Sequence, residues 1–313
     1  MRYKQWCEIA PRTEQQKRAY KLKIVKQNAV GTSMVILPFL GFLCFTLFPM
    51  LLSLALAFSN LRSALISEAT FDAGLKNFIY VIKDEYTWKA MRTTLVYSLT
   101  TFLNVAIAVF LASVMNRHIY GKKFYFVLFF LPQVCSSVAV AMMWRWVFAE
   151  NGVINAFRLV GGKQAIDFFT DANYYMFAIF VMSVWKNGTN IVILLSAFSA
   201  INKSLQEAAR LDGADEMHVF LNVTFPQLTP TIFYLITMNL IAALQEQALF
   251  QLINTSATGP DFWGLTLTYQ MYRLMNVNLQ YGLSCAMSWF IGIFILIVTK
   301  INFALSEKWV SYD

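Results

Sequence analysis

Long apolar runs constrain this chain more than any other feature of its sequence. A helix needs about 20 apolar residues to cross the hydrocarbon core of a bilayer. Two apolar segments carry one charged residue each, at 174–201 and 228–250, and four uncharged runs of comparable length lie at 34–58, 93–115, 124–144 and 281–299. The sequence therefore predicts an all-α integral membrane protein with six transmembrane helices.

The composition agrees with this class and disfavours the others. Of 313 residues, 58% are hydrophobic and 13% are charged, which is too apolar for a soluble domain. The two histidines and four scattered cysteines show no metal-ligand or redox spacing, so we expect no bound metal and no cofactor. Paired acids, a histidine cluster and a nucleophile motif are also missing from the sequence, so we expect no enzymatic activity.

The net charge of +8 comes mainly from the N-terminal segment. Residues 1–30 contain eight Lys or Arg and precede an apolar run that is too long for a cleaved signal peptide. Such charge beside a first span is explained by orientation in the membrane rather than by nucleic-acid binding. We expect a cytoplasmic basic segment (1–30), a transmembrane domain (31–313) and both termini in the cytoplasm of a multi-pass cell-membrane protein. The first outer loop, 60–92, weakens the contrast because it holds five basic and four acidic residues.

A polar stretch at residues 204–230, between two apolar segments, has the helix-start and helix-end residues that a rigid elbow of two short helices requires. Ser204 and Glu207 have the spacing of a capping box, and Gly213 stands where such a short helix would end. A second short helix can begin near Asp215, and Pro226 marks the start of the next span. Residues 72–92, in the first outer loop, mix apolar and charged positions at helical spacing, which predicts an interfacial helix.

The residues of this elbow closely resemble the EAA loop of permease subunits in binding-protein-dependent ABC importers. The resemblance is strongest to the carbohydrate-uptake family (maltose, multiple-sugar and glycerol-phosphate types), and it implies the six-helix type I ABC importer (MetI-like) fold. It also implies that loop 202–227 is the coupling helix region, which docks in a groove on an ATPase subunit. The matching positions are Glu207, Ala208, Ala209, Asp212, Gly213, Ala214, Phe220 and Pro226.

The resemblance further implies a set of partners. These are a second EAA-bearing permease subunit, two ABC ATPase subunits that bind ATP and Mg²⁺, an extracytoplasmic solute-binding protein and a carbohydrate substrate. The chain itself has no Walker A sequence with which to bind ATP. One departure concerns the segment at Thr258–Pro260, where the family often has Gly-Gly-Pro and this chain has threonine at the first position.

Two charged residues lie inside predicted spans, Lys186 and Glu246. A charge at the bilayer centre costs roughly 2.5–3.5 kcal/mol, so neither should face lipid. One interpretation is a structural Lys186–Glu246 pair or contacts to a partner subunit. The other is a water-filled substrate path with hydrogen-bonding neighbours, which agrees with the resemblance because substrate contacts in such permeases lie on the spans before and after the EAA loop. The neighbours are Asn187, Asn190, Gln245 and Gln247, while the nearby aromatic residues Trp185, Phe250 and Trp263 suit packing better than sugar stacking.

An alternative function is a secondary transporter driven by an ion gradient, with Lys186 and Glu246 as its coupling charges. Such a protein would show inverted repeats and discontinuous helices. The sequence shows no convincing sign of either, so we favour the importer, although Gly188 could open a gap in the helix wall.

Overall fold

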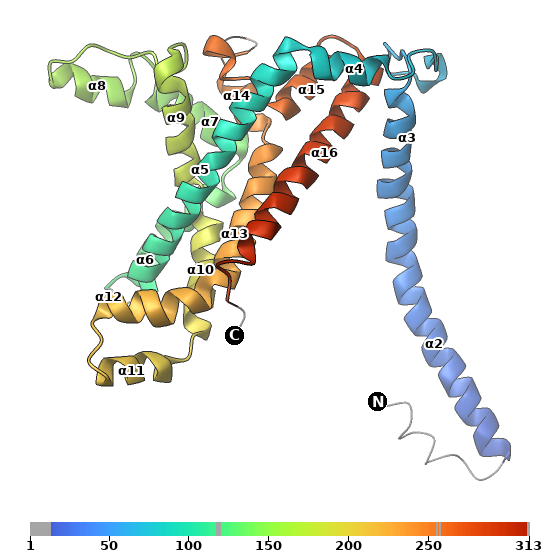
Figure 1. Ribbon diagram of the computed structural model, residues 1–313, viewed down its shortest axis with the longest axis horizontal. Coiled ribbons are helices and arrows are strands. Elements are labelled where there is room, and N and C mark those ends of the chain that lie inside the picture. The colour runs from blue at the N-terminus through green and yellow to red at the C-terminus, as the bar shows by residue number, and fades with distance from the viewer. Residues whose placement is uncertain (1–13, 117–119, 255, 257, 312–313) are drawn as a thin grey trace. The chain divides into compact units, whose positions relative to one another are not determined.

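The computed structural model describes residues 14–116, 120–254, 256 and 258–311, and all regular elements in these ranges are helices (Figure 1). The chain divides into two compact units, Met1–Leu56 and Ala57–Asp313. The basic segment predicted at 1–30 lies partly outside the described residues, which begin within it at Glu14.

The first unit is a long helix that contains one wide turn. Helix α2 (Glu14–Phe42) continues through a π-helical turn (Leu43–Leu47) into α3 (Phe48–Ala57). The turn comes directly before Pro49, whose missing N–H interrupts the regular ladder of hydrogen bonds. Residues 27–57 are long and apolar enough to cross a membrane, which confirms the first predicted span.

The second unit contains the other spans and their connections. Its short 3-10 turns are Ile66–Glu68 and Pro260–Phe262. Its helices are α4 (Lys76–Lys83), α5 (Glu85–Asn116), α6 (Lys122–Val134), α7 (Ser137–Val147), α8 (Val153–Val160), α9 (Ala172–Trp185), α10 (Gly188–Ala200), α11 (Lys203–Leu211), α12 (Glu216–Val219), α13 (Phe225–Leu244), α14 (Ala248–Ile253), α15 (Leu267–Asn276) and α16 (Tyr281–Ser306).

Three spans of this unit are continuous and two are bent. The continuous ones are 85–116, 216–244 and 281–306. The chain bends by 104° between α6 and α7 and by 46° between α9 and α10. When each bent pair is counted as one span, the described chain has six spans. The described chain therefore has discontinuous spans at two places, although its sequence shows no convincing sign of them. Proline inside α6, at Pro132, favours the first break, because a proline removes a helical hydrogen bond.

Helix α5 occupies the centre of the second unit. It packs against α10 and α13, and its small residues Ala108 and Ala112 are fully buried there. Small residues let neighbouring backbones approach closely, which is the usual basis of helix association in membranes. Figure 1 shows α11 and α12 at one end of the bundle and α4, α8 and α15 at the other.

The interfacial helix predicted at 72–92 is in fact divided between two helices. Helix α4 ends at Lys83 and α5 begins at Glu85, with Asp84 between them. The Asp84 carboxylate accepts the backbone N–H and the hydroxyl of Thr87, each at 3.0 Å, as an N-cap does. This local capping ends the short helix and starts the long one.

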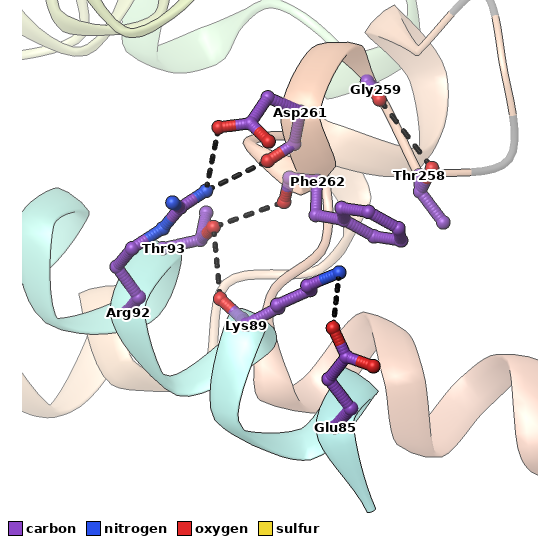
Figure 2. A network of polar contacts seen from close by, with 8 residues as sticks. All are labelled: Glu85, Lys89, Arg92, Thr93, Thr258, Gly259, Asp261 and Phe262. Carbon is purple, nitrogen blue, oxygen red and sulfur yellow. Dashed lines mark hydrogen bonds and ion pairs between the residues drawn. The ribbon is translucent and has the colours of Figure 1, made fainter.

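The loop after α14 is held against the start of α5, as Figure 2 shows. Arg92 donates to the backbone oxygen of Asp261 at 2.7 Å and pairs with its carboxylate at 3.5 Å. The hydroxyl of Thr93 donates to the backbone oxygen of Phe262 at 3.1 Å, and Lys89 Nζ lies 3.8 Å from the centre of the Phe262 ring. Asp261 and Phe262 have φ values of 44° and 64°, so these contacts stabilise a backbone that L residues rarely adopt.

The same loop shows why glycine is required at position 259. Gly259 has φ +67°, and a Cβ there would lie 2.6 Å from the backbone nitrogen of Gly264. The requirement for glycine therefore falls on the second position of the segment.

Candidate functional site

A cavity of about 230 Å³ lies among the membrane-spanning helices of the second unit. Its wall is contributed by α5, α6, α7, α9, α13 and α14 and by the breaks that follow α9 and α13. The lining residues are Tyr97, Thr100, Thr101, Asn104, Gln133, Ser137, Val140, Met182, Ser183, Lys186, Asn239, Ala242, Ala243, Glu246, Ala248 and Leu249.

The two charged residues predicted inside the spans both line this cavity. Lys186 follows the last residue of α9, at the bend before α10, and its Nζ donates to Ser137 Oγ at 3.3 Å. Glu246 lies between α13 and α14, where its Oε1 accepts the Leu249 N–H, in the first turn of α14, at 3.0 Å. The two side chains form no ion pair within 4.0 Å of each other. The described residues thus show no Lys186–Glu246 pair, and contacts of these side chains to a partner subunit stay a prediction.

Asn187 and Asn190 lie behind the cavity and connect three spans. The Asn187 amide donates to the backbone oxygen of Asn104 at 2.6 Å, and the Asn190 amide donates to Asn187 Oδ1 at 2.6 Å. Asn190 and Asn239 also exchange hydrogen bonds of 3.3 and 2.9 Å. Asn187 and Asn190 are 4% and 8% exposed, so this buried network fixes α5, α10 and α13 beside the bend.

The two predicted glutamines are not among the cavity residues. Gln245 is exposed, and the Gln247 amide donates to Gln251 Oε1 at 3.0 Å. The nearby aromatic residues serve packing, as expected. Phe250 is fully buried, Trp185 contacts Trp144 edge to face, and Arg92 lies 4.0 Å over the ring of Trp263.

Several lining residues were not found by sequence reasoning. Thr100, Asn104 and Ser183 are uncharged polar residues in largely apolar spans, and Ser, Thr and Asn residues also occur where helices pack against one another. Asn104 and Asn239 could have been found from their amide groups, because a buried amide needs partners from other helices.

The predicted elbow forms at the end of the unit where α5 terminates. Helix α11 is capped by Asn202, whose side chain accepts the Ser204 N–H at 3.0 Å, so the prediction of Ser204 as the cap was wrong by two residues. Gly213 has φ +88°. The Gly213 N–H donates to the Arg210 oxygen at 3.1 Å and the Ala214 N–H to the Ala209 oxygen at 3.0 Å, which is the Schellman pattern at a helix end.

The second half of the elbow differs from the prediction. Helix α12 is not a separate short helix, because it continues through a π-helical turn (Phe220–Thr224) into α13 as one span over 216–244. The turn again precedes a proline, Pro226, near the start of the following helix. Asp215 caps the start of α12 by accepting the His218 N–H at 2.8 Å.

An ion pair joins α11 to α12. Arg210 Nε donates to Glu216 Oε1 at 2.8 Å, and this hydrogen bond, with the charge of Glu216, raises the pKa of Arg210. The backbone and ring N–H groups of His218 lower the pKa of Asp215. A lowered pKa means that the Asp215 cap stabilises the fold above about pH 4 and is lost only in more acidic solution.

The elbow exposes a mixed surface. Glu207, Ala208 and Asp212 are exposed, while Ala209, Ala214, Phe220 and Pro226 are half-buried against the rest of the loop and span. Large apolar side chains are exposed beside them, with Leu205 at 49%, Leu211 at 89% and Met217 at 63%. Exposed apolar residues gathered on α11 and the start of α12 indicate a surface for another protein.

Comparisons with known proteins agree on one family. The family model described as "Binding-protein-dependent transport system inner membrane component" matches residues 104–310. The chain is 34% identical over 296 residues to the probable ABC transporter permease protein YesP of Bacillus subtilis (strain 168), covering 93% of this chain and 94% of that protein. It is 30% identical over 265 residues to the sn-glycerol-3-phosphate transport system permease protein UgpA of Agrobacterium fabrum (strain C58 / ATCC 33970), covering 83% and 89%.

A solved structure shows the same fold. A chain of the bacterial alginate ABC transporter, in complex with an alginate pentasaccharide-bound periplasmic protein, superposes with a TM-score of 0.79 at 22% identity, covering 91% of this chain and 96% of that one. With the family match and the membrane-spanning helices, this likeness confirms the predicted fold. The chain is a multi-pass membrane protein that belongs to the family of binding-protein-dependent transport system inner membrane components.

Proposed function

We propose that this chain is the permease subunit of an ABC importer and that it passes a carbohydrate through the cavity lined by Lys186 and Glu246. The observation that carries the proposal is this polar cavity inside the spans, in a unit whose far end carries an exposed elbow of the EAA type. Hydroxyl, amide and charged side chains offer the donors and acceptors that a sugar requires. Asn187 and Asn190 support the cavity from behind.

The elbow is proposed to transmit ATP hydrolysis to the spans. Its residues Glu207 to Ala209 and Asp212 to Ala214 would lie in a groove of an ATPase subunit, with Leu205 and Leu211 as apolar anchors. Phe220 and Pro226 would join the elbow rigidly to the span that carries Glu246. Two ATPase subunits would bind ATP and Mg²⁺, while this chain would bind no cofactor and catalyse no reaction.

A second EAA-bearing permease subunit and an extracytoplasmic solute-binding protein complete the proposed assembly. The solved alginate transporter is described with a periplasmic protein bound, which supports a partner of that kind. We infer that both termini lie in the cytoplasm, with residues 1–30 as a basic segment before a transmembrane domain at 31–313. The elbow then faces the ATPases, and the loop of Figure 2 faces the solute-binding protein.

The ion-driven alternative is disfavoured. Bent spans of the kind expected in secondary transporters are present in the described residues, at α6–α7 and α9–α10. Family membership, however, supports the importer, since its members work with a binding protein. Uptake that depends on ATP, and not on an ion gradient, is the expected result.

The substrate path is tested by comparing two polar positions close to each other. Lys186→Met removes a charge from the cavity wall, so ATP-driven sugar uptake by the reconstituted complex should fall at least about tenfold, the effect of losing about 1.4 kcal/mol. Gln245→Ala serves as the matched control, because Gln245 is exposed outside the cavity and its loss should leave uptake near the wild-type rate. Equal uptake by both variants, with both complexes assembled, would refute the path.

The angle of the elbow is tested by exchanging charges. Glu216→Lys places a second cation beside Arg210, so uptake and substrate-stimulated ATPase activity should both fall as the two helices separate. The double exchange Arg210→Glu with Glu216→Arg restores an attractive pair and should recover most of both activities. If the double variant is as impaired as the single one, the ion pair does not set the angle.

A further inference from the structure

Two hydroxyl groups on one side of the cavity offer lone pairs rather than protons. Thr100 donates its hydroxyl proton to the Tyr97 oxygen at 2.6 Å, and Ser183 donates to the Phe180 oxygen at 2.8 Å. Both hydroxyls line the cavity with their protons already committed to the backbone. Each can still accept a hydrogen bond from a ligand.

Asn104 adds a third acceptor to the same wall. Its amide group donates to Ser183 Oγ at 3.1 Å, and its Oδ1 atom is buried with no partner among the described residues. A buried acceptor without a partner costs about 1–3 kcal/mol, so a shift of the Asn104 side chain that lets a ligand hydroxyl donate to this oxygen is favoured. Asn239, by contrast, has both its amide and its oxygen engaged with Asn190. The unsatisfied acceptor therefore belongs to the wall formed by α5 and α9.

The charges of the cavity sum to zero. Lys186 and Glu246 are the only Lys, Arg, Asp or Glu residues among those that line it. An uncharged ligand can receive a hydrogen bond from Lys186 and donate one to Glu246 while the cavity stays neutral. A phosphate dianion has no proton to give to the acceptor wall, and it would leave net negative charge in a medium of low dielectric constant.

We propose that the permease cavity selects uncharged sugars or polyols, held through their hydroxyl protons by the acceptors Thr100, Asn104, Ser183 and Glu246, with Lys186 as the main donor. This ligand class differs from the glycerol phosphate in the name of the relative UgpA. The inference rests on the proposed function, because it assumes that the ligand passes through this cavity.

A reporter in the cavity separates this selectivity from that of the solute-binding protein. Gln133 lines the cavity and is exposed, so Gln133→Cys places a thiol there. The assembled importer, in nanodiscs and without its binding protein, is treated with a water-soluble thiosulfonate, and modification at position 133 is read by mass spectrometry. The probes are maltose and glucose as uncharged sugars, and glucuronate and glucose 6-phosphate as anions.

We expect the uncharged sugars to protect the thiol at concentrations at least about tenfold lower than the anions, the ratio that about 1.4 kcal/mol of discrimination gives. Glu246→Gln, added to the reporter, keeps an oxygen for the Leu249 N–H but leaves the cavity with one positive charge. Glucuronate should then gain about tenfold relative to maltose. A purely structural role for Glu246 would not change this ratio.

Three results would overturn the inference. They are equal or better protection by the anions in the wild-type cavity, an unchanged ratio in Glu246→Gln, and no protection by any sugar. Failure of the proposed function is distinguishable, because it appears in a separate measurement. In that case the complete importer with its binding protein would show no ATP-driven uptake of any carbohydrate.

Discussion

Replacing Gly213 by valine is expected to abolish ATP-driven uptake while the protein still inserts into the membrane. Gly213 has φ +88° and holds the Schellman end of α11, and a Cβ there would meet no atom within 4 Å. The effect therefore comes from the backbone alone. A left-handed conformation costs an L residue roughly 1–2 kcal/mol, and β-branched residues tolerate it least. Valine should turn the chain out of this conformation and misdirect α11.

The measurements for this prediction are uptake and substrate-stimulated ATPase activity in the reconstituted complex. Gly213→Asn is the matched control, because asparagine adopts left-handed backbone more readily than other non-glycine residues. It should keep most of both activities. Normal stimulation of ATPase activity in Gly213→Val would show that the orientation of α11 does not carry the coupling.

The expected difference between valine and asparagine at position 213 depends only on the local backbone. The same local dependence made the first half of the elbow predictable from the sequence. A glycine at a helix end is a local signal, since the chain itself needs left-handed backbone there. The spans were predictable for a similar reason, because length and apolar composition suffice to define them. The cap was misplaced because Asn202 and Ser204 are both good capping residues and stand two positions apart.

The residues of the candidate cavity could be predicted only where burying the side chain in the membrane costs much free energy. Lys186 and Glu246 were found because a charge inside a span must face something polar. Thr100 and Ser183 carry no such signal, because a hydroxyl can satisfy itself on the backbone of its own helix, as both do. Gln245 was included because it neighbours Glu246, although the end of α13 turns it out of the cavity.

The bend between α9 and α10 was hidden because it depends on residues far apart in the sequence. Gly188 begins α10 directly after the 46° bend. The need for glycine there comes from the close approach of the α6 backbone. A Cβ at Gly188 would lie 2.4 Å from the Phe129 oxygen and 3.0 Å from the Phe130 Cα. The residues around Gly188 do not indicate that α6 comes this close. The two backbones can approach only because glycine has no side chain.

Gly188→Ala is accordingly expected to damage both stability and transport. The atoms that a Cβ would meet belong to the backbone of α6, so no side-chain rotation relieves the contact and α10 must move away. Overpacking of this kind costs about 1–3 kcal/mol. Because Asn187 and Lys186 directly precede this glycine, the same shift would break the hydrogen bond from Asn187 to α5 and displace the cavity lysine.

Two measurements on the purified complex check this prediction, the thermal unfolding midpoint and ATP-driven sugar uptake. Gly292→Ala is the matched control, because Gly292 also lies in a membrane-spanning helix and a Cβ there would meet no atom within 4 Å. It should retain the wild-type midpoint and rate, whereas Gly188→Ala should lower both. A wild-type midpoint in Gly188→Ala would mean that α6 and α10 do not approach this closely in the membrane. The bend would then not depend on a glycine, and the position of Lys186 in the cavity would need another cause.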